Sequence, residues 1–430
     1  MATSVLRRSV ARALWTVVAC ATLLLAANAC DSSSTIGLGV GPDSLRGGDP
    51  VELTVPVRNM QDTTLQPAVT SGLTLPIGTS INRVVAGRVD DPVIGITTAQ
   101  GYVDFSAPRV YPPGYASDVT EIQSVTLELE PNYVYGDTTQ PVELTVFDTA
   151  AEWSADSLRA DTTLGRLGEI TTLTYNPSDT LVTVDFPQSW IDANEPVLTD
   201  TSDSFANRFN GIALTHASGN AVVGFQRATA VLRVRTQVDT LAFTGRKVFS
   251  GVSYAEDGTL PQGRALLQQT TGQAAVFSLP KDEAPLDTLG QAPVNRARIV
   301  LPVDTLTFDR NTPMGFVRPA PNAFVLVARL AEGAPLCTEL GLSFFDANSC
   351  AIPLVRLDEG LVAGTIQATG GLPTATLENL FERIAQDGPL FTRYRVQVAS
   401  SQVAPNVLLL TTPQSTNAPV PRAELVVTPL

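Results

Sequence analysis

Short runs in which apolar and polar residues alternate recur along most of the chain. Apolar side chains at every second position are typical of strands that bury one face, and the Gly, Pro, Asp and Thr residues between the runs favour turns. The pattern predicts an all-β chain, with strands that include 51–57, 125–129, 142–147, 181–186, 212–215, 231–234, 297–303, 324–328, 407–410 and 425–427.

One segment has the spacing of a helix instead. Over 376–386, four apolar residues follow the pattern i, i+3, i+4, i+7, and a Gly-Pro pair just beyond favours a stop; they are Leu377, Leu380, Phe381 and Ile384. We expect this helix to cover one end of a sheet, and a shorter helical turn to hold Trp190 and Ile191.

The predicted elements occur twice in the order strand, strand, helix, strand, strand. Such a repeat indicates two related units, although two β-rich halves can also resemble each other by chance. We therefore predict a mostly β protein of two tandem antiparallel β-sandwich, jelly-roll-like domains, each with a short capping helix. The first domain would span 51–236 and the second 263–430, joined by a polar linker at 237–262.

If each half closes its own core, alternation selects the residues that fill it. For the first half these are Leu127, Leu129, Leu144, Val146, Ile212 and Leu214. For the second they are Ile299, Leu301, Val325, Val327, Leu408 and Leu410. A fragment that starts near Gly263 would then fold alone.

The N-terminus has the three parts of a secretory signal peptide, expected at 1–29. Three arginines precede an apolar run at 13–27, and small residues lead to Cys30. That run of about 15 residues is shorter than the ~20 that a membrane-spanning helix needs. We expect the segment to be removed on export.

Two cleavage chemistries compete at the same bond. Ala27-Asn28-Ala29 fits ordinary signal cleavage, whereas Ala29 before Cys30 fits a lipoprotein peptidase. Cys20 would leave with the signal, and Cys337 can pair with Cys350, so an unmodified Cys30 would be an odd thiol in an oxidising compartment. We therefore expect a lipid on Cys30, with 30–50 as a lipidated tether; plain secretion is the alternative.

The formal net charge of −14 limits the partners of the chain. Such an acidic protein repels nucleic acid, which excludes it as an expected partner. The expected contacts are a membrane, through the N-terminal lipid, and a glycan or another envelope protein.

Signatures of catalysis and of cofactors are missing from the sequence. The single histidine, His216, excludes two-histidine zinc motifs, and no nucleophile elbow or phosphate-binding glycine loop accompanies it. A calcium loop is conceivable among Asp156, Asp161, Asp200 and Asp203, but solvated turn residues are the simpler interpretation. We therefore expect no metal, no cofactor and no enzymatic activity.

Cys337 and Cys350 lack the spacing of metal or redox pairs. A disulfide between them would close a short loop and contribute about 3 kcal/mol to stability.

Four tyrosines lie among Pro, Gly and Asn in expected loops of the first domain: Tyr111, Tyr115, Tyr133 and Tyr135. Aromatic faces beside polar loop groups suit glycan contact. The alternative is that these tyrosines pack at the edge of a domain with only the hydroxyl group in water.

Three runs of the chain resemble a family of bacterial surface lipoproteins catalogued as domain of unknown function 4270. They are 35–40, 86–99, and 272–280 leading into 294–303. The resemblance implies tandem domains like those of carbohydrate-binding proteins and lends no known activity. Within the second run, Asp91-Pro92 followed by Gly95 is turn chemistry, with the next strand expected to resume at Thr98.

The sequence thus predicts an exported cell-envelope lipoprotein at the outer membrane or cell surface, acting as a non-catalytic structural or interaction module. A polysaccharide-binding protein is the second interpretation, and a carbohydrate-active enzyme the third.

Overall fold

The computed structural model describes residues 49–64, 82–113, 121–154, 161–201, 205–256, 260–280, 292–340, 342–364, 377–387, 390–399 and 404–428, with Tyr115, Val119, Leu158, Leu286 and Leu289. The expected signal peptide, Cys30 and most of the tether lie outside these residues. Residues 49–429 form one compact unit. No helix in the described ranges is both long enough and apolar enough to cross a bilayer.

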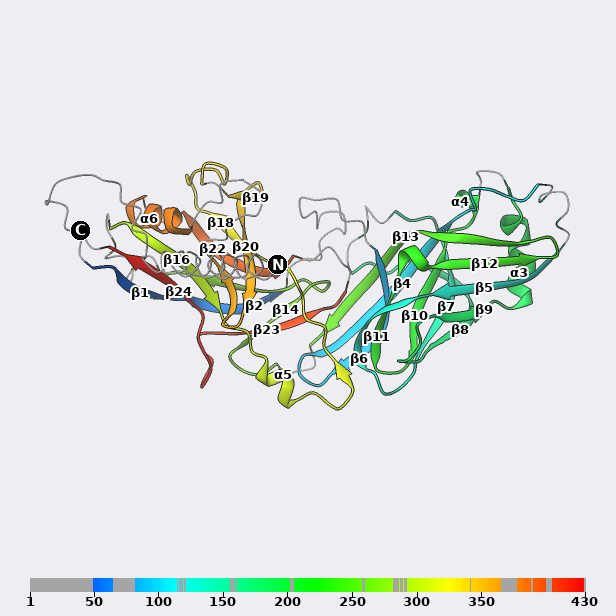
Figure 1. Cartoon of the computed structure of the whole chain (residues 1–430), viewed down its shortest axis with the longest axis horizontal. Helices are drawn as coiled ribbons and strands as arrows, with labels where there is room; N and C mark the ends of the chain where they lie inside the picture. Colours follow the sequence, from blue (N-terminus) through cyan, green and yellow to red (C-terminus); the bar gives the residue numbers. More distant parts are fainter. Residues whose placement is uncertain are drawn as a thin grey trace, which may run out of the picture. The chain divides into compact units, whose positions relative to one another are not determined.

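Most described residues belong to two large antiparallel sheets, which confirms the predicted mostly β fold (Figure 1). The first sheet runs β17-β6-β11-β3-β4-β13-β12-β5-β9, with β10 between β4 and β7, and β8 beyond β7. Its strands are β3 (Arg83–Asp91), β4 (Gly95–Ser106), β5 (Ile122–Leu129), β6 (Pro131–Asp137), β7 (Val142–Thr149), β8 (Arg166–Tyr175), β9 (Val182–Asp185), β10 (Ile212–Ser218), β11 (Ala221–Gln226), β12 (Val231–Thr236), β13 (Thr240–Ala255) and β17 (Phe316–Val317).

The second sheet runs β1-β24-β16-β21-β20-β18-β22-β15-β14-β23, with β19 on β20 and β2 on β15. Its strands are β1 (Val51–Pro56), β2 (Arg58–Thr64), β14 (Arg264–Gln268), β15 (Gln273–Ser278), β16 (Val294–Leu301), β18 (Phe324–Leu330), β19 (Ser343–Asp346), β20 (Ser349–Leu357), β21 (Gly360–Ala363), β22 (Phe391–Val398), β23 (Val407–Thr411) and β24 (Arg422–Val427).

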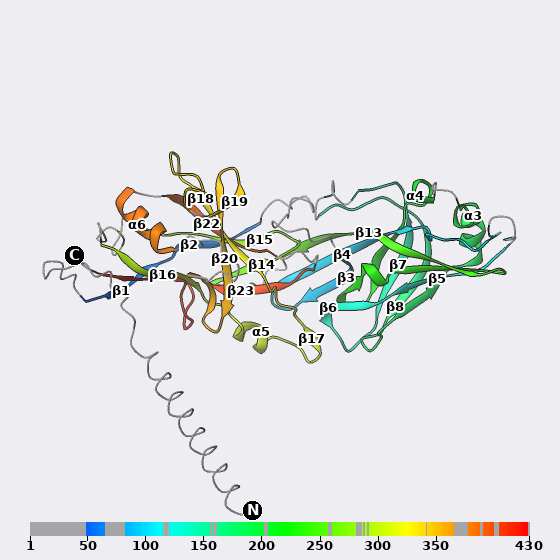
Figure 2. The same cartoon turned by 45° about the horizontal axis from the view of Figure 1, so that its top comes forward.

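Both predicted helical segments are confirmed. They are α3 (Gln188–Leu198), which packs on β5, and α6 (Leu377–Asp387), which lies beside β16 (Figures 1 and 2). The apolar face of α6 enters the core, and Glu382 accepts a hydrogen bond from the backbone of Val294 at 2.8 Å. The remaining short helices are α4 (Phe205–Arg208), η3 (Arg227–Thr229) and α5 (Leu306–Arg310).

The first sheet curls around a core that contains all six residues predicted for it. Leu127, Leu129, Leu144, Val146, Ile212 and Leu214 are fully buried there. Trp190 of α3 covers this core, and its indole N–H donates to Asp148 Oδ2 at 2.8 Å. Strand alternation therefore located the first core correctly.

The second sheet folds into two layers because β20 passes from one layer to the other. Its first part pairs with β18, through Phe324 and Leu354, and its last part pairs with β21, through Val355 and Val362. Between the layers lies a second core, which includes four of the six predicted residues: Ile299, Leu301, Leu408 and Leu410. This arrangement is a β-sandwich.

The prediction for β18 was wrong by one residue. Phe324, Leu326 and Ala328 face the second core, whereas Val325 and Val327 belong to a small cluster on the opposite side of the strand. Both sides of β18 are apolar, and on such a strand alternation cannot tell which face is the inner one.

The structure also corrects the expected boundaries along the chain. Most of the expected linker is β13, a strand of 16 residues that pairs with both β4 and β12. The N-terminal strands β1 and β2 belong to the second sheet, paired with β24 and β15. Conversely, β17 from the second half pairs with β6 in the first sheet. The two halves therefore exchange strands.

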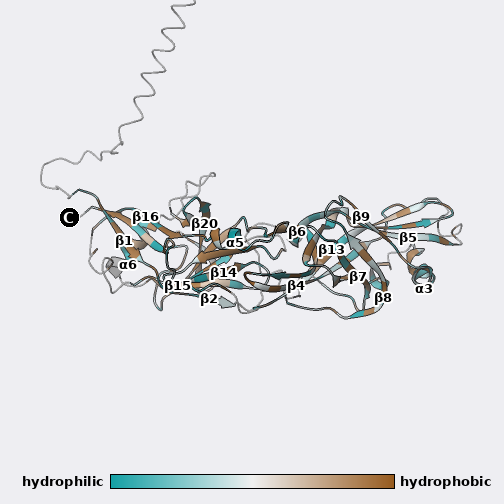
Figure 3. Cartoon of the chain, turned by 90° about the horizontal axis from the view of Figure 1, so that it is seen from below, coloured by the Kyte–Doolittle hydropathy of each residue, from teal (hydrophilic) through white to brown (hydrophobic). Residues whose placement is uncertain are grey.

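A third apolar cluster joins the two sheets. It combines Val89 and Val222 of the first sheet, and Ile94 of the turn between β3 and β4, with Leu266 and Leu409 of the second sheet. Both faces of β3, β4 and β11 are therefore buried, so their positions do not follow a simple alternation of apolar and polar residues. Figure 3 shows hydrophobic positions along the strands of both sheets.

The repeated order of elements corresponds to a repeated arrangement in part. In the first half β5 pairs with β9 and β12, and α3 packs on β5. In the second half β16 pairs with β21 and β24, and α6 packs on β16. The remaining predicted strands differ, because β7 pairs with β8 and β10, whereas β18 pairs with β20 and β22.

Candidate functional site

The predicted disulfide between Cys337 and Cys350 is present. The two Cα atoms are 5.4 Å apart, and both side chains are fully buried in the second core. Cys350 lies on β20, so the bridge ties the segment around Cys337 to that strand. Cys20 and Cys30 lie outside the described residues.

Two of the four tyrosines expected to contact a glycan pack together near the first core. The ring of Tyr115 is 1% exposed, and its centroid lies 5.4 Å from that of Tyr111. The Tyr111 hydroxyl donates to the carbonyl oxygen of Asp200 at 3.2 Å. A sugar has no access to the face of Tyr115.

The other two tyrosines lie on β6 and not in a loop. Tyr135 is fully buried, and the ring of Tyr133 lies 5.1 Å from the guanidinium group of Arg83. Burial raises the pKa of both hydroxyl groups above their usual range. Tyr111 and Tyr115 belong to a different cluster from Tyr133 and Tyr135, so the four do not form one binding surface.

His216 is an ordinary strand-end residue. It lies near the end of β10, where its Nε2 is 2.9 Å from the carbonyl oxygen of Gly219. Among the described residues, no group of three or more His, Cys, Asp or Glu side chains could hold a metal ion. Of the acids considered for calcium, Asp200 pairs with Arg208 at 3.1 Å, whereas Asp156 and Asp203 lie outside the described ranges.

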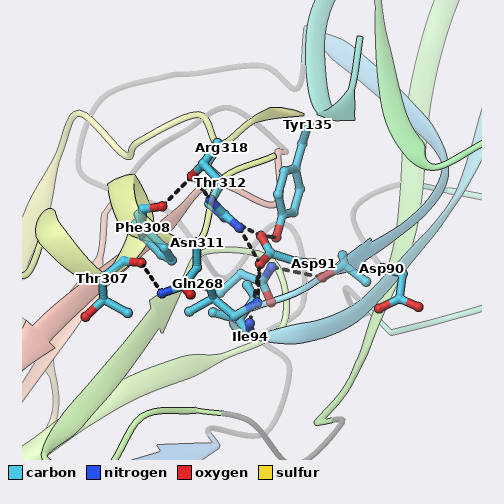
Figure 4. Close-up of polar contacts among 12 residues, drawn as sticks. Asp90, Asp91, Ile94, Tyr135, Gln268, Thr307, Phe308, Asn311, Thr312 and Arg318 are labelled. Atoms are coloured by element: carbon cyan, nitrogen blue, oxygen red, sulfur yellow. Dashed lines mark hydrogen bonds and ion pairs between the residues drawn. The ribbon is translucent and has the colours of Figure 1, made fainter. Parts of the chain in front are cut away.

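The turn after β3 is confirmed, and it holds a buried ion pair that the sequence did not predict (Figure 4). The strand resumes at Gly95, which pairs with Asp91, and not at Thr98. Asp91 Oδ1 accepts the N–H groups of Val93 at 2.9 Å and Ile94 at 3.4 Å, so the side chain caps its own turn.

Asp91 also binds Arg318, which follows β17. Arg318 Nε donates to Asp91 Oδ2 at 2.6 Å, and Nη2 donates to Oδ1 at 3.0 Å. The Tyr135 hydroxyl donates to the same carboxylate at 2.9 Å, and the rings of Phe308 and Phe316 lie 4.9 Å and 4.8 Å from the guanidinium carbon. Because both charged side chains are buried and their polar groups are paired with each other and with Tyr135 and Thr312, we interpret this cluster as structural.

The best candidate for a binding site is a cleft of about 400 Å³ on the outer face of the second sheet, opposite the second core. We call it the arginine cleft. It is lined by Thr63, Val276, Val327, Arg329, Asp346, Ala347, Asn348, Ser349, Arg393 and Arg395. Three guanidinium groups thus gather in a protein whose net charge is −14.

Strand register brings these arginines together. On β22, Arg393 and Arg395 flank Tyr394, whose ring stacks on Phe277 in the second core with centroids 5.3 Å apart. Successive side chains of a strand point to opposite faces, so both arginines point outward. Arg329 of β18 lies directly opposite Arg393, and Val327 opposite Arg395. The same register therefore supplies a charged wall and an apolar floor.

The hairpin between β19 and β20 forms another wall of the arginine cleft. Asp346 Oδ1 accepts the backbone N–H of Asn348 at 2.9 Å, which orders the turn. Ser349 begins β20, next to the disulfide-bonded Cys350. The Phe345 ring lies 5.3 Å from the guanidinium carbon of Arg395.

A second cleft, of about 420 Å³, shares Thr63 with the first and has the opposite charge. Its lining includes the carboxyl groups of Asp62 and Glu256 and the hydroxyl group of Tyr254. Removal of water from around the Asp62 carboxyl group raises its pKa to about 6, and Glu256 adds to the rise, whereas the N–H of Leu266 opposes it. A basic and an acidic cleft therefore adjoin along β2.

No protein-family model matches the chain, and a search of curated proteins finds no match either. The resemblance to the family of surface lipoproteins stays a prediction.

The arginine cleft was missed because its parts are far apart in the sequence. One local signal existed, the Arg-Tyr-Arg run at 393–395, in which charged and apolar positions alternate within a strand. Nothing local connects this run with Arg329 or with the hairpin at 346–349.

Proposed function

We propose that the protein is an exported cell-envelope lipoprotein, held to a membrane by a lipid on Cys30, that acts as a non-catalytic interaction module at the bacterial surface. The disulfide between Cys337 and Cys350 carries this proposal. Disulfides of this kind persist in oxidising compartments, which fits export. Once Cys20 leaves with the signal peptide, Cys30 is the single remaining thiol, and acylation gives it a role.

The arginine cleft supports the second part of the proposal. The protein repels most anions through its net negative charge, yet this cleft presents three cations on one sheet face. A local patch of positive charge on a protein of negative net charge favours the binding of a specific partner over general adhesion. The three guanidinium groups also fit the second candidate function, the binding of a polysaccharide, if that polysaccharide carries carboxylate groups.

Metabolic labelling with an alkyne fatty acid tests the anchor. We expect label on the wild-type protein and none on Cys30→Ser, because the thiol is the acyl acceptor. The matched control is the double variant Cys337→Ser/Cys350→Ser, which should keep the label. Failure of the wild type to take up label, or equal labelling of Cys30→Ser, would remove the lipoprotein claim.

A further inference from the structure

The three cations of the arginine cleft form no salt bridge with a carboxylate of the described residues. Arg329 and Arg393 are exposed, and Arg395 is half-buried. Elsewhere, Arg298 binds both Glu424 and Glu359, and Arg318 binds Asp91. Across the described ranges, no carboxylate forms an ion pair with Arg329, Arg393 or Arg395. Their charge is therefore available to a ligand.

Arg395 is the most constrained of the three. Its guanidinium group is half-buried over Phe345, and its Nε atom is buried without any hydrogen-bond acceptor. Burial lowers its pKa, and the neighbouring Arg393 lowers it further, whereas Asp346 opposes both. A buried donor without an acceptor carries a free-energy cost, and a larger one when it is charged. A bound anion would remove that cost.

The other residues that line the cleft limit the kinds of anion that would fit it. Asp346 is exposed at the rim, where it would repel a ligand made only of negative charges. A ligand with hydroxyl groups could donate to this carboxylate and to Asn348 and Ser349. The floor is apolar, formed by Val276 and Val327, and it suits the C–H face of a sugar ring.

We propose that the arginine cleft binds a uronic acid unit of an acidic polysaccharide. The sugar carboxylate binds Arg393 and Arg395, since guanidinium groups hold carboxylates with two parallel hydrogen bonds. Ring hydroxyl groups donate to Asp346, and Arg329 contacts a neighbouring acidic unit of the chain. An acidic peptide offers the same charge but few donors for Asp346, so the cleft favours the sugar. This inference rests on the proposed function, because it names the partner of the interaction module.

Calorimetric titration of the full mature chain with a galacturonic acid hexamer tests the assignment. Maltohexaose, a neutral hexamer, and hexaglutamate are the comparison ligands. The test variant is Arg393→Gln/Arg395→Gln, and the matched control is Arg235→Gln/Arg356→Gln, which removes the same charge from exposed strand positions. Circular dichroism melts establish that each variant is folded.

We expect the uronic acid hexamer to bind the wild type, and the test variant to lose at least about tenfold in affinity. The matched control should change it less than about twofold. Maltohexaose should not bind, and hexaglutamate should bind more weakly than the sugar. No binding of the hexamer, equal losses in the two double variants, or tighter binding of hexaglutamate would overturn the inference. Labelling of Cys30 does not involve the cleft, so it separates failure of this inference from failure of the anchor.

Discussion

Asp91 and Arg318 lie 227 positions apart in the sequence and form a two-point ion pair in which both side chains are buried. Asp91 belongs to the last position of β3, and Arg318 directly follows β17, the short strand that the second half contributes to the first sheet. The pair therefore fixes the place where the two halves of the chain meet. Loss of this pair should therefore lower the stability of the whole fold and not only that of the turn after β3.

We predict that Arg318→Met lowers the free energy of unfolding by about 3–5 kcal/mol, because the Asp91 carboxylate would remain buried without a countercharge. Urea unfolding measures the change. The control is Arg296→Met, which removes an exposed partner of Glu52 at 3.6 Å and should cost at most about 1 kcal/mol. Equal losses of stability in the two variants would show that the buried pair contributes no more than an exposed ion pair.

The disulfide should contribute measurably to stability. Replacing both cysteines by serine, Cys337→Ser/Cys350→Ser, should lower the free energy of unfolding by about 3 kcal/mol, because the bridge closes a short loop in the unfolded chain. Non-reducing peptide mapping should link the two cysteine peptides in the wild type. Two alkylatable thiols in oxidised protein would contradict this account.

The lowered pKa of Asp304 predicts that the fold loses stability in acid. Burial alone would raise its pKa, but hydrogen bonds from Thr307 and Arg264 more than offset that effect and hold the pKa below its ordinary value. A carboxyl group with a lowered pKa in the folded state stabilises the fold above its unfolded pKa, and this contribution disappears as the pH falls through the folded value.

The measurement is the urea midpoint of the wild type and of Asp304→Asn between pH 7 and pH 3. The wild type should be more stable by a constant margin above about pH 5, and the margin should shrink below about pH 4. A margin that stays constant or grows in acid would show that Asp304 does not act through its charge.

The exchange of strands leads to a prediction opposite to the one drawn from the sequence. A fragment of residues 263–428 lacks β1, β2 and the residue between them, Val57. The missing segment supplies Val55, Val57 and Met60 to the second core. We expect it to melt without cooperativity. Val51 pairs with Val427, so a short linker from residue 428 to residue 49 could restore both strands in a permuted fragment.

The permuted fragment, with 49–64 attached after 428, should melt cooperatively when its unfolding is measured by circular dichroism. A matched control carries the same segment with Val55 and Met60 changed to Asp, which should abolish the gain. If the bare fragment 263–428 already melts cooperatively at the same temperature, β1 and β2 are dispensable and the sequence-based boundary is adequate.

Part of the fold could be predicted because several strands bury one face only. Leu127 and Leu129 in β5 alternate with polar residues, so period-two patterning located the strand and its inner face. The helix α6 and the disulfide were also predictable, since helical spacing and cysteine counting are local signals.

The remaining features depend on contacts between distant segments. Val325 and Val327 were assigned to the wrong face because both sides of β18 are buried. The register that places Arg329 opposite Arg393 and the pairing of Asp91 with Arg318 leave no trace in local sequence. The arginine cleft is therefore a property of strand pairing, and a single sequence does not specify it.

The central claim is that this protein holds an acidic polysaccharide at the cell surface through two separable parts, the lipid on Cys30 and the arginine cleft. The most direct test is the amount of fluorescent galacturonic acid hexamer retained by washed cells that express the wild type, Cys30→Ser, or Arg393→Gln/Arg395→Gln. The account predicts retention by the wild type alone, with the Cys30→Ser protein found in the medium still able to bind the hexamer. Retention by cells carrying either variant at the wild-type level would contradict it.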